Sequence, residues 1–182
     1  YEVLEPWGNP HISRSMNWGL QPITHDGVTL STAIGSADVM LGAVNNSNVS
    51  DSSNDADDEM GVIVSVGCAV GDVSVSVAGL YDETDASDTD TTILNAIVSG
   101  DAGDIGWALE GNYVEEDAAT DTEAVGVALY LGTSVGETDL DLRVEWADDE
   151  RSGGRGLFGQ DSDAWGVSLT GSWALTDGVD LR

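Results

Sequence analysis

TDLDLRVEW, residues 138 to 146, alternates strictly between charged and apolar side chains after its first residue. The odd positions are all charged: Asp139, Asp141, Arg143 and Glu145. The even positions are all apolar: Leu140, Leu142, Val144 and Trp146. Successive side chains of an extended chain point to opposite faces, so this segment predicts a strand with one apolar and one charged face. The medium on each side of that strand determines the class of protein.

The composition is that of a folded and very acidic chain. Its 182 residues, 41% of them hydrophobic, are enough for one domain with a core. The 34 Asp and Glu residues stand against 5 basic residues, all of them Arg, for a formal net charge of -29. Because such a surface repels phosphate, nucleic acid is not expected as a partner, whereas cations are favoured.

Alternation with a period of two recurs along most of the chain and predicts strands. The clearest segments are 28–34, 62–70, 73–77, 105–113, 125–131, 138–146 and 165–175. Segments 37–45 and 92–99 alternate less clearly, and segment 12–21 and a stub from residue 179 complete the set. We therefore expect an all-β, antiparallel up-and-down meander of about eleven strands.

The predicted connections alternate between short and long. The short ones, rich in Gly and Asp, fall at 34–38, 69–72, 100–104, 135–138 and 175–178. The long ones fall at 45–59, 82–90, 115–123 and 147–163, and each holds five acidic residues. Tight turns at one end of the strands and long loops at the other are typical of a transmembrane β-barrel. The length of the clearest strands agrees, since about 9 to 11 tilted residues cross a bilayer.

Aromatic residues on the apolar faces support a membrane-spanning barrel. Trp165 and Trp173 are eight residues apart, which at a usual strand rise and tilt separates them by about 20 Å along the membrane normal. That spacing approaches the distance between the two aromatic girdles of a barrel. The expected girdle residues are Trp107, Tyr113, Trp146, Trp165 and Trp173.

The faces opposite the apolar ones carry small polar side chains, as in 168–172, which suit the inside of a closed barrel. Lipid then contacts Leu140 to Trp146, and a lumen contacts Asp139 to Glu145. The candidate pore-lining residues are Glu110, Asp139, Asp141, Arg143, Glu145 and Asp180. We expect Arg143 to pair with carboxylates on its own or neighbouring strands. A lining made mostly of carboxylates favours cations over anions.

A different class of protein is compatible with the same alternation. The apolar faces could pack against each other in a soluble, secreted, acidic β-sandwich. Such a surface or matrix protein would bind divalent cations through its Asp-rich loops, in particular DADDE (55–59) and DASDTD (85–90). No cofactor and no complete metal site is expected in either case, and weak binding of Ca²⁺ or another divalent cation at the acidic loops stays open. Without detergent, a soluble sandwich should stay monodisperse, whereas a membrane barrel should not.

NPHISRSMNWGLQPITHDGV, residues 9 to 28, resembles a segment of the OmpL-like β-barrel porin-2 family. The matching residues are Ser13, Arg14, Ser15, Pro22, Thr24, His25, Gly27 and Val28, whereas Asp26 departs from the expected Thr. The resemblance implies a barrel in the outer membrane of a Gram-negative bacterium, surrounded by lipid and conducting ions or other small solutes. It does not identify the solute, and homo-oligomerisation stays open.

The domain expectation is one β-barrel covering residues 1–182. The chain opens at Tyr1 and ends as a strand begins, so we expect part of a longer precursor, trimmed at both ends, whose barrel has twelve or more strands. All three prolines lie within the first 22 residues, so residues 1–11 are expected to form a loop or a segment inside the lumen. Arg14 fits a strand badly, because it shares parity with Ile12 and Met16 and would face lipid.

No enzymatic activity is expected. His25 and Asp26 are adjacent, and neighbouring side chains of a strand point apart, so they do not form a base with its orienting carboxylate. The glycines at 154, 156 and 159 have the spacing of a dinucleotide-binding motif, but they lie in an acidic loop that precedes another strand.

Overall fold

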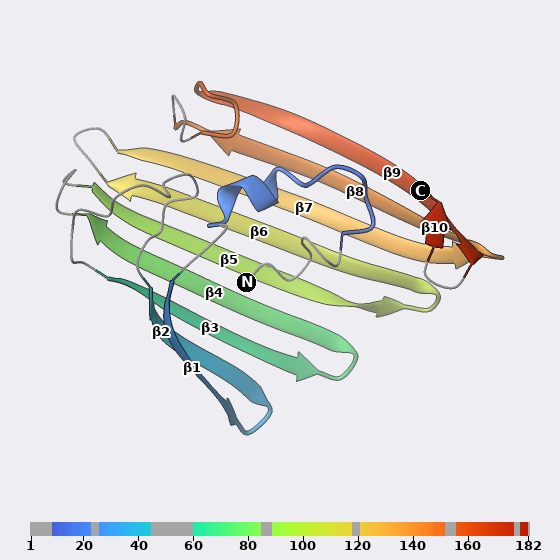
Figure 1. The fold of residues 1–182 in the computed structure, drawn as a ribbon, viewed down its shortest axis with the longest axis horizontal. Coiled ribbons are helices and arrows are strands. Elements are labelled where there is room, and N and C mark those ends of the chain that lie inside the picture. Colours follow the sequence, from blue (N-terminus) through green and yellow to red (C-terminus); the bar gives the residue numbers. More distant parts are fainter. Residues whose placement is uncertain are drawn as a thin grey trace.

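The computed structural model describes residues 9–22, 26–44, 60–84, 89–117, 121–151, 156–176 and 179–181, apart from the side chains at 84, 89, 179 and 180. In these residues ten strands form one sheet in the order β1 to β10, and each strand is antiparallel to the next (Figure 1). The predicted all-β, up-and-down meander is confirmed. All ten strands belong to a single layer, so the β-sandwich alternative is wrong.

The shortest strands lie toward the two edges of the sheet. They are β1 Gly27–Ile34, β2 Ala37–Val44, β3 Gly61–Val70, β4 Val73–Thr84, β5 Thr89–Ala102, β6 Ile105–Asp117, β7 Thr122–Val135, β8 Thr138–Asp149, β9 Ser162–Thr176 and β10 Val179–Leu181. Strands β4 to β9 have between 12 and 15 residues. Each is therefore longer than the roughly 9 to 11 residues that cross a bilayer.

The expected strand at 12–21 is wrong. These residues include the short 3₁₀ helix η1, Asn17–Leu20, in which Gly19 N donates to Met16 O at 3.0 Å and Gln21 N to Trp18 O at 3.2 Å. The backbone thus bonds within its own turn rather than to a neighbouring strand. The described sheet has 10 strands as a result, rather than about eleven.

The acidic loops are shorter than expected, because the strands continue into them. Cross-strand pairing persists at Asp82↔Thr91, Glu115↔Glu123 and Asp148↔Asp163. The earlier alternation is lost at these positions because acidic residues appear on the outer face and apolar residues such as Val114 and Ala124 on the inner face, although the backbone ladder does not end. Periodicity alone therefore places the strand ends too early.

Glycine closes the tight turns at the other end of the sheet. Gly35, Gly71, Gly103 and Gly136 each start a two-residue turn with a φ of 66°, 63°, 67° and 67°. Residues with a Cβ rarely adopt this conformation, and a glycine at the first central position is typical of hairpin turns that suit the twist of the strands. The short turns at 35–36, 71–72, 103–104 and 136–137 agree with the sequence prediction; residues 177–178 lie outside the described residues.

The register divides the side chains into two faces. Cross-strand partners share a face. Leu142 pairs with Leu131 and Leu169, on what we call the outer face, whereas Arg143 pairs with Tyr130 and Ser168, on the inner face. The outer face stays apolar until the loop ends of the strands, and Val28, Trp165 and Leu169 are 74% to 77% exposed there.

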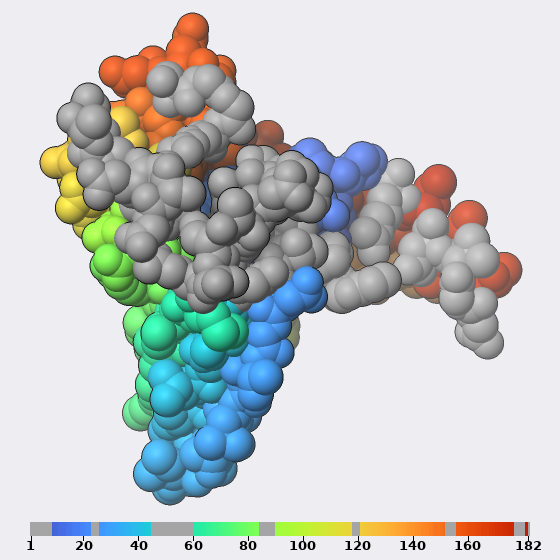
Figure 2. Space-filling view, turned by 60° about the vertical axis from the view of Figure 1, so that its left-hand side comes forward, coloured from blue at the N-terminus to red at the C-terminus, as the bar shows by residue number. Residues whose placement is uncertain are grey.

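The sheet curves but does not close within the described residues, because β1 and β10 have no pairing with each other. The β1–β2 hairpin projects away from the rest of the molecule (Figure 2), and every residue of β1 is exposed. A hydrophobic cluster forms instead near the loop end, around Leu20, Ile63, Leu80, Ile93 and Val114. Among the described residues, no helix has the length and apolar character needed to cross a bilayer.

Candidate functional site

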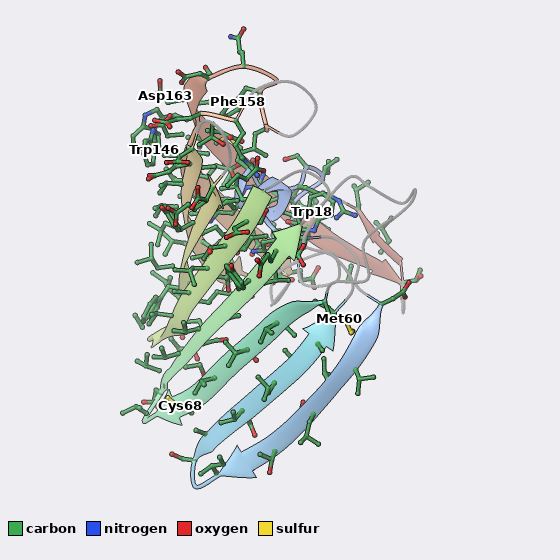
Figure 3. All side chains as sticks on the ribbon, turned by 90° about the vertical axis from the view of Figure 1, so that its left-hand side faces the viewer. Trp18, Met60, Cys68, Trp146, Phe158 and Asp163 are labelled. Atoms are coloured by element: carbon green, nitrogen blue, oxygen red, sulfur yellow. The ribbon has the colours of Figure 1, made fainter. Side chains whose placement is uncertain are left out.

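Residues 9–22, which we call the inner segment, lie against the inner face of the sheet. In Figure 1 the η1 helix lies over β6 and β7, and both strands contact it. Trp18 and Trp146 lie on opposite sides of the strand wall in Figure 3. The contacts described next join this segment to β6, β7, β8 and β9.

Arg143 on β8 is the main anchor of the inner segment and is 1% exposed. Its Nε donates to Oε1 of Glu145 at 3.0 Å. Its Nη1 donates to the carbonyl oxygen of Ser13 at 3.1 Å. Its Nη2 donates to the Ser13 hydroxyl at 3.0 Å and to the Arg14 carbonyl oxygen at 3.1 Å. Nη2 also donates to the Ser168 hydroxyl on β9 at 3.2 Å. A buried guanidinium is thus neutralised on its own strand, as the sequence predicted, and fixes two backbone carbonyls of the segment.

Glu145 completes this anchor from the other side. Its Oε2 accepts a hydrogen bond from the backbone N–H of Met16 at 2.6 Å. An ideal Cβ built on Gly166, the cross-strand partner of Glu145, would lie 2.8 Å from Cγ of Glu145. The glycine therefore leaves the space that the carboxylate side chain occupies.

Glu110 on β6 is a second anchor and is 4% exposed. Its Oε1 accepts from Nε2 of Gln21 at 2.6 Å, from Nδ2 of Asn112 at 3.2 Å and from Nδ2 of Asn95 at 3.3 Å, and its Oε2 accepts from the Tyr130 hydroxyl at 2.9 Å. A buried carboxylate is costly unless its oxygens are hydrogen-bonded, and here both oxygens are. The far end of the inner segment is thereby held at β6.

Close packing holds the middle of the segment. Asn17 and Leu20 are 0% exposed, and Nδ2 of Asn17 donates to the Glu110 carbonyl oxygen at 3.4 Å. A Cβ on Gly126 of β7 would collide with Oδ1 of Asn17 and would lie 2.8 Å from Cδ1 of Leu20. The wall therefore needs a glycine at 126 for η1 to approach this closely.

His11 attaches the start of the segment to β9. Its Nδ1 lies 2.8 Å from Oγ1 of Thr170, and the ring is buried, with no partner for Nε2 among the described residues. Burial and, to a smaller extent, the nearby Arg143 cation lower the pKa of His11 below its usual 6.5. The imidazole is accordingly neutral at neutral pH.

The side of the segment that faces away from the wall carries a cation. Arg14 is exposed, and its guanidinium carbon lies 3.7 Å from the centroid of the Trp18 ring. A guanidinium over an indole face is favourable because the ring quadrupole attracts it. Arg14 therefore avoids the lipid-facing position that a strand would have forced on it.

Part of the β8–β9 connection also folds inward. Asp149 is 0% exposed and accepts from Nε of Arg151 at 2.9 Å, from Nη2 of Arg151 at 2.9 Å and from the backbone N–H of Leu157 at 2.7 Å. Nη1 of Arg151 lies 3.8 Å from Glu116. A Cβ on Gly19 would collide with Leu157, so this connection packs directly against the inner segment.

Residues 1–182 match the family described as "Putative beta-barrel porin-2, OmpL-like". The chain belongs to this family. A solved porin structure, refined at 1.8 Å resolution, matches with a TM-score of 0.61 and 16% sequence identity, over 86% of this chain and 54% of that porin. This porin-2 chain thus spans about half the length of the porin it matches, and the likeness shows the fold. A comparison with curated proteins finds no significant match.

The six candidate pore-lining residues of this porin-2 chain fall into three groups. Glu110, Arg143 and Glu145 are buried beneath the inner segment, whereas Asp139 is exposed and Asp141 half-buried on the same face. Asp180 lies on β10, and its side chain lies outside the described residues. Their role as the lining of a pore stays a prediction.

The predicted girdle residues all lie on the outer face. Trp165 is 74% and Trp173 45% exposed, and Trp107, Tyr113 and Trp146 are half-buried. The rings of Trp146 and Trp165 are neighbours, with centroids 6.4 Å apart and planes tilted by 45°. A contact with the membrane interface stays a prediction for all five.

The residues of the family motif separate in the structure. Ser13, Arg14, Ser15 and Pro22 belong to the inner segment, and Gly27 begins β1. Ser15 is buried, and its hydroxyl accepts from the backbone N–H of Trp18 at 3.0 Å. Thr24 and His25 lie outside the described residues.

Several residues of the site escaped the sequence reasoning: Asn17, Gln21, Asn95, Tyr130, Asp149 and Arg151. The available signal was the set of glycines at inner-face positions, above all Gly126 and Gly166, which mark where another segment or a long side chain comes close. Among the described residues, no group of three or more His, Cys, Asp or Glu side chains is placed to hold a metal ion. DADDE (55–59) and most of DASDTD (85–90) lie outside the described residues, so divalent-cation binding there stays a prediction.

Proposed function

We propose that this chain forms a channel of a bacterial outer membrane through which small solutes diffuse passively, with a preference for cations. Family membership and the porin fold support the general class. The preference for cations rests on the charges of the inner face.

The exposed outer face carries this proposal. Val, Leu, Ile and Trp side chains cover it on every long strand, and among the described residues nothing lies over it. An exposed apolar surface that spans a whole sheet is unfavourable in water, because monomeric soluble proteins rarely expose contiguous apolar patches beyond a few hundred Å². In a bilayer the same surface is stable, provided that the sheet edges are paired.

Along the strands, the outer face also changes from apolar to acidic residues, as the surface of a membrane protein does. Its apolar residues on β6 run from Ile105 to Tyr113, and the next outward residue is Glu115. On β8 they run to Trp146, and the next is Asp148. The carboxylates thus begin only at the loop end, where the long strands would leave the hydrocarbon.

The position of two carboxylates on the inner face supports the cation preference. Asp101 and Asp141 share one cross-strand row with Gly106 and Gly132 between them. Asp101 Oδ1 lies 3.6 Å from an ideal Cβ on Gly106, and Asp141 Oδ1 lies 2.9 Å from one on Gly132, so both carboxylates extend over the glycines. The two arginines that are buried among the described residues, Arg143 and Arg151, are already neutralised by carboxylates.

Single-channel recording in planar bilayers under a KCl gradient tests the proposal. We expect ohmic conductance with a reversal potential of the cation-selective sign. The double variant Asp101→Asn and Asp141→Asn should conduct but with a weaker cation preference, and Asp26→Asn, outside the strands, serves as the matched control. Absence of conductance would refute the channel, and anion preference in the wild type would refute the cation preference alone.

A further inference from the structure

We propose that the inner segment is a fixed constriction that sets the size limit and tunes the charge preference of the channel, and that Arg143 is the residue that positions it. This inference rests on the proposed function, because it places the inner face around a water-filled lumen.

The inner segment is fixed along its whole length rather than at one end. His11 is held by Thr170 on β9, Ser13 and Arg14 by Arg143 on β8, and Gln21 by Glu110 on β6. A segment that merely rested in the lumen would need neither buried charges nor bonds from three different strands. Each anchor is a charged or polar side chain that is itself at most 8% exposed.

The wall is shaped to receive this segment. Gly126 leaves no room for a Cβ beneath Asn17 and Leu20, so η1 lies directly on the β7 backbone. From the loop side, Leu157 covers Gly19. Such close packing on two sides indicates a single position, because displacement by even one side-chain width would lose the contacts of Leu20.

The segment also changes the charge that a passing ion meets. It covers the carboxylates of Glu110 and Glu145, which would otherwise face the lumen, and it presents the exposed guanidinium of Arg14 over Trp18. It also covers Arg143, which is paired with Glu145, so a net wall charge of one carboxylate is replaced by one cation at this level. The segment should therefore lower the cation preference that Asp101 and Asp141 create nearer the tight turns.

The test replaces residues 9–22 with a glycine-serine linker of the same length in the full chain. Removing a constriction should raise the single-channel conductance roughly twofold or more, admit larger polyethylene glycols and shift the reversal potential toward cations. Arg14→Gln is the matched variant, because its side chain takes no part in the anchors. It should shift only the reversal potential and leave the polymer size limit unchanged.

The outcomes separate this inference from the channel itself. No conductance by the wild type would refute the proposed function. A conducting wild type with an unchanged linker variant, in conductance and in size limit, would overturn the constriction while leaving the channel.

If the linker variant does not assemble, two other variants test the same inference. Trp18→Ala trims the lumen side of the segment without touching its anchors, and it should still raise the conductance. Asn17→Cys with Gly126→Cys, in a Cys68→Ala background, tests the position, because the ideal Cβ at 126 lies 3.2 Å from Cγ of Asn17. Oxidation should cross-link these cysteines fully without changing the conductance; failure to cross-link, or a current that changes on cross-linking, would overturn the fixed placement.

Discussion

The inner faces of β6–β9 and of β1 follow the same alternation, but the inner segment covers only the first of them. On β8 and β6, Arg143 and Glu110 are almost fully buried under the inner segment. On β1, every residue is exposed, including Thr29 and Ser31 on the inner face. Alternation thus decides which side chains face inward, whereas their polar and apolar contacts with the inner segment decide which of them are covered.

The largest effect is expected from breaking the main anchor of the covered region. Arg143→Ala leaves Glu145 as a buried carboxylate without its cation and releases Ser13 and Arg14, which should lower the free energy of unfolding by about 3 to 5 kcal/mol. Urea unfolding in detergent micelles measures it. Ser31→Ala is the control from the open region and should change the free energy by less than about 0.5 kcal/mol. Equal effects of the two variants would show that the segment is not anchored by charge.

A second test uses two glycines on neighbouring strands, one facing inward beneath the inner segment and one facing outward. Gly126→Ala places a methyl group against Asn17 and Leu20 and should destabilise the protein by roughly 1 to 3 kcal/mol, as overpacking does. Gly111→Ala, on the open outer face with nothing within 4 Å, should be nearly neutral. Thermal unfolding of both variants measures the difference, and a stable Gly126→Ala protein with native tryptophan fluorescence would contradict the close packing.

The strands of both regions could be predicted from the sequence because their two faces carry side chains of different polarity. The predicted segments 105–113, 125–131 and 165–175 lie inside β6, β7 and β9. Their loop-side ends could not be found in this way, since beyond Tyr113 and Val125 the outer face becomes acidic while the inner face carries the apolar Val114 and Ala124, which breaks the earlier alternation. The backbone ladder continues there without it.

The inner segment could not be predicted, because the bonds that fix it connect distant parts of the chain. Arg143 and Ser13 are 130 positions apart, and nothing near Ser13 in the sequence indicates its partner. Ile12, Met16 and Leu20 are apolar residues at even positions, a pattern that also fits a strand. Arg14 and the prolines contradicted that interpretation locally, and the glycine at 126 was the remaining distant clue.

The pH dependence of the stability provides a further comparison, because His11 lies in the covered region. Its pKa is lower in the folded protein than the usual 6.5, so the folded state binds fewer protons than the unfolded state. The stability that neutral His11 contributes is complete above pH 6.5 and is lost as the pH falls below that value toward the folded pKa. Denaturant midpoints measured from pH 7.5 to 5 should fall more steeply in the wild type than in His11→Gln. Parallel profiles would show that His11 is not held neutral at the wall.

The smallest effect is expected at the loop end of the outer face, where acidic side chains replace the apolar ones. Glu115 and Glu123 are cross-strand partners of like charge, an arrangement that opposes pairing. Glu123→Gln should therefore raise the melting temperature slightly, by about 1 °C at low salt, and the gain should vanish at high salt as screening removes the repulsion. Thr122→Ala, one position earlier and facing inward, is the control and should show no dependence on salt. A gain that persists in high salt would indicate that the glutamate is unfavourable there for a reason other than its charge.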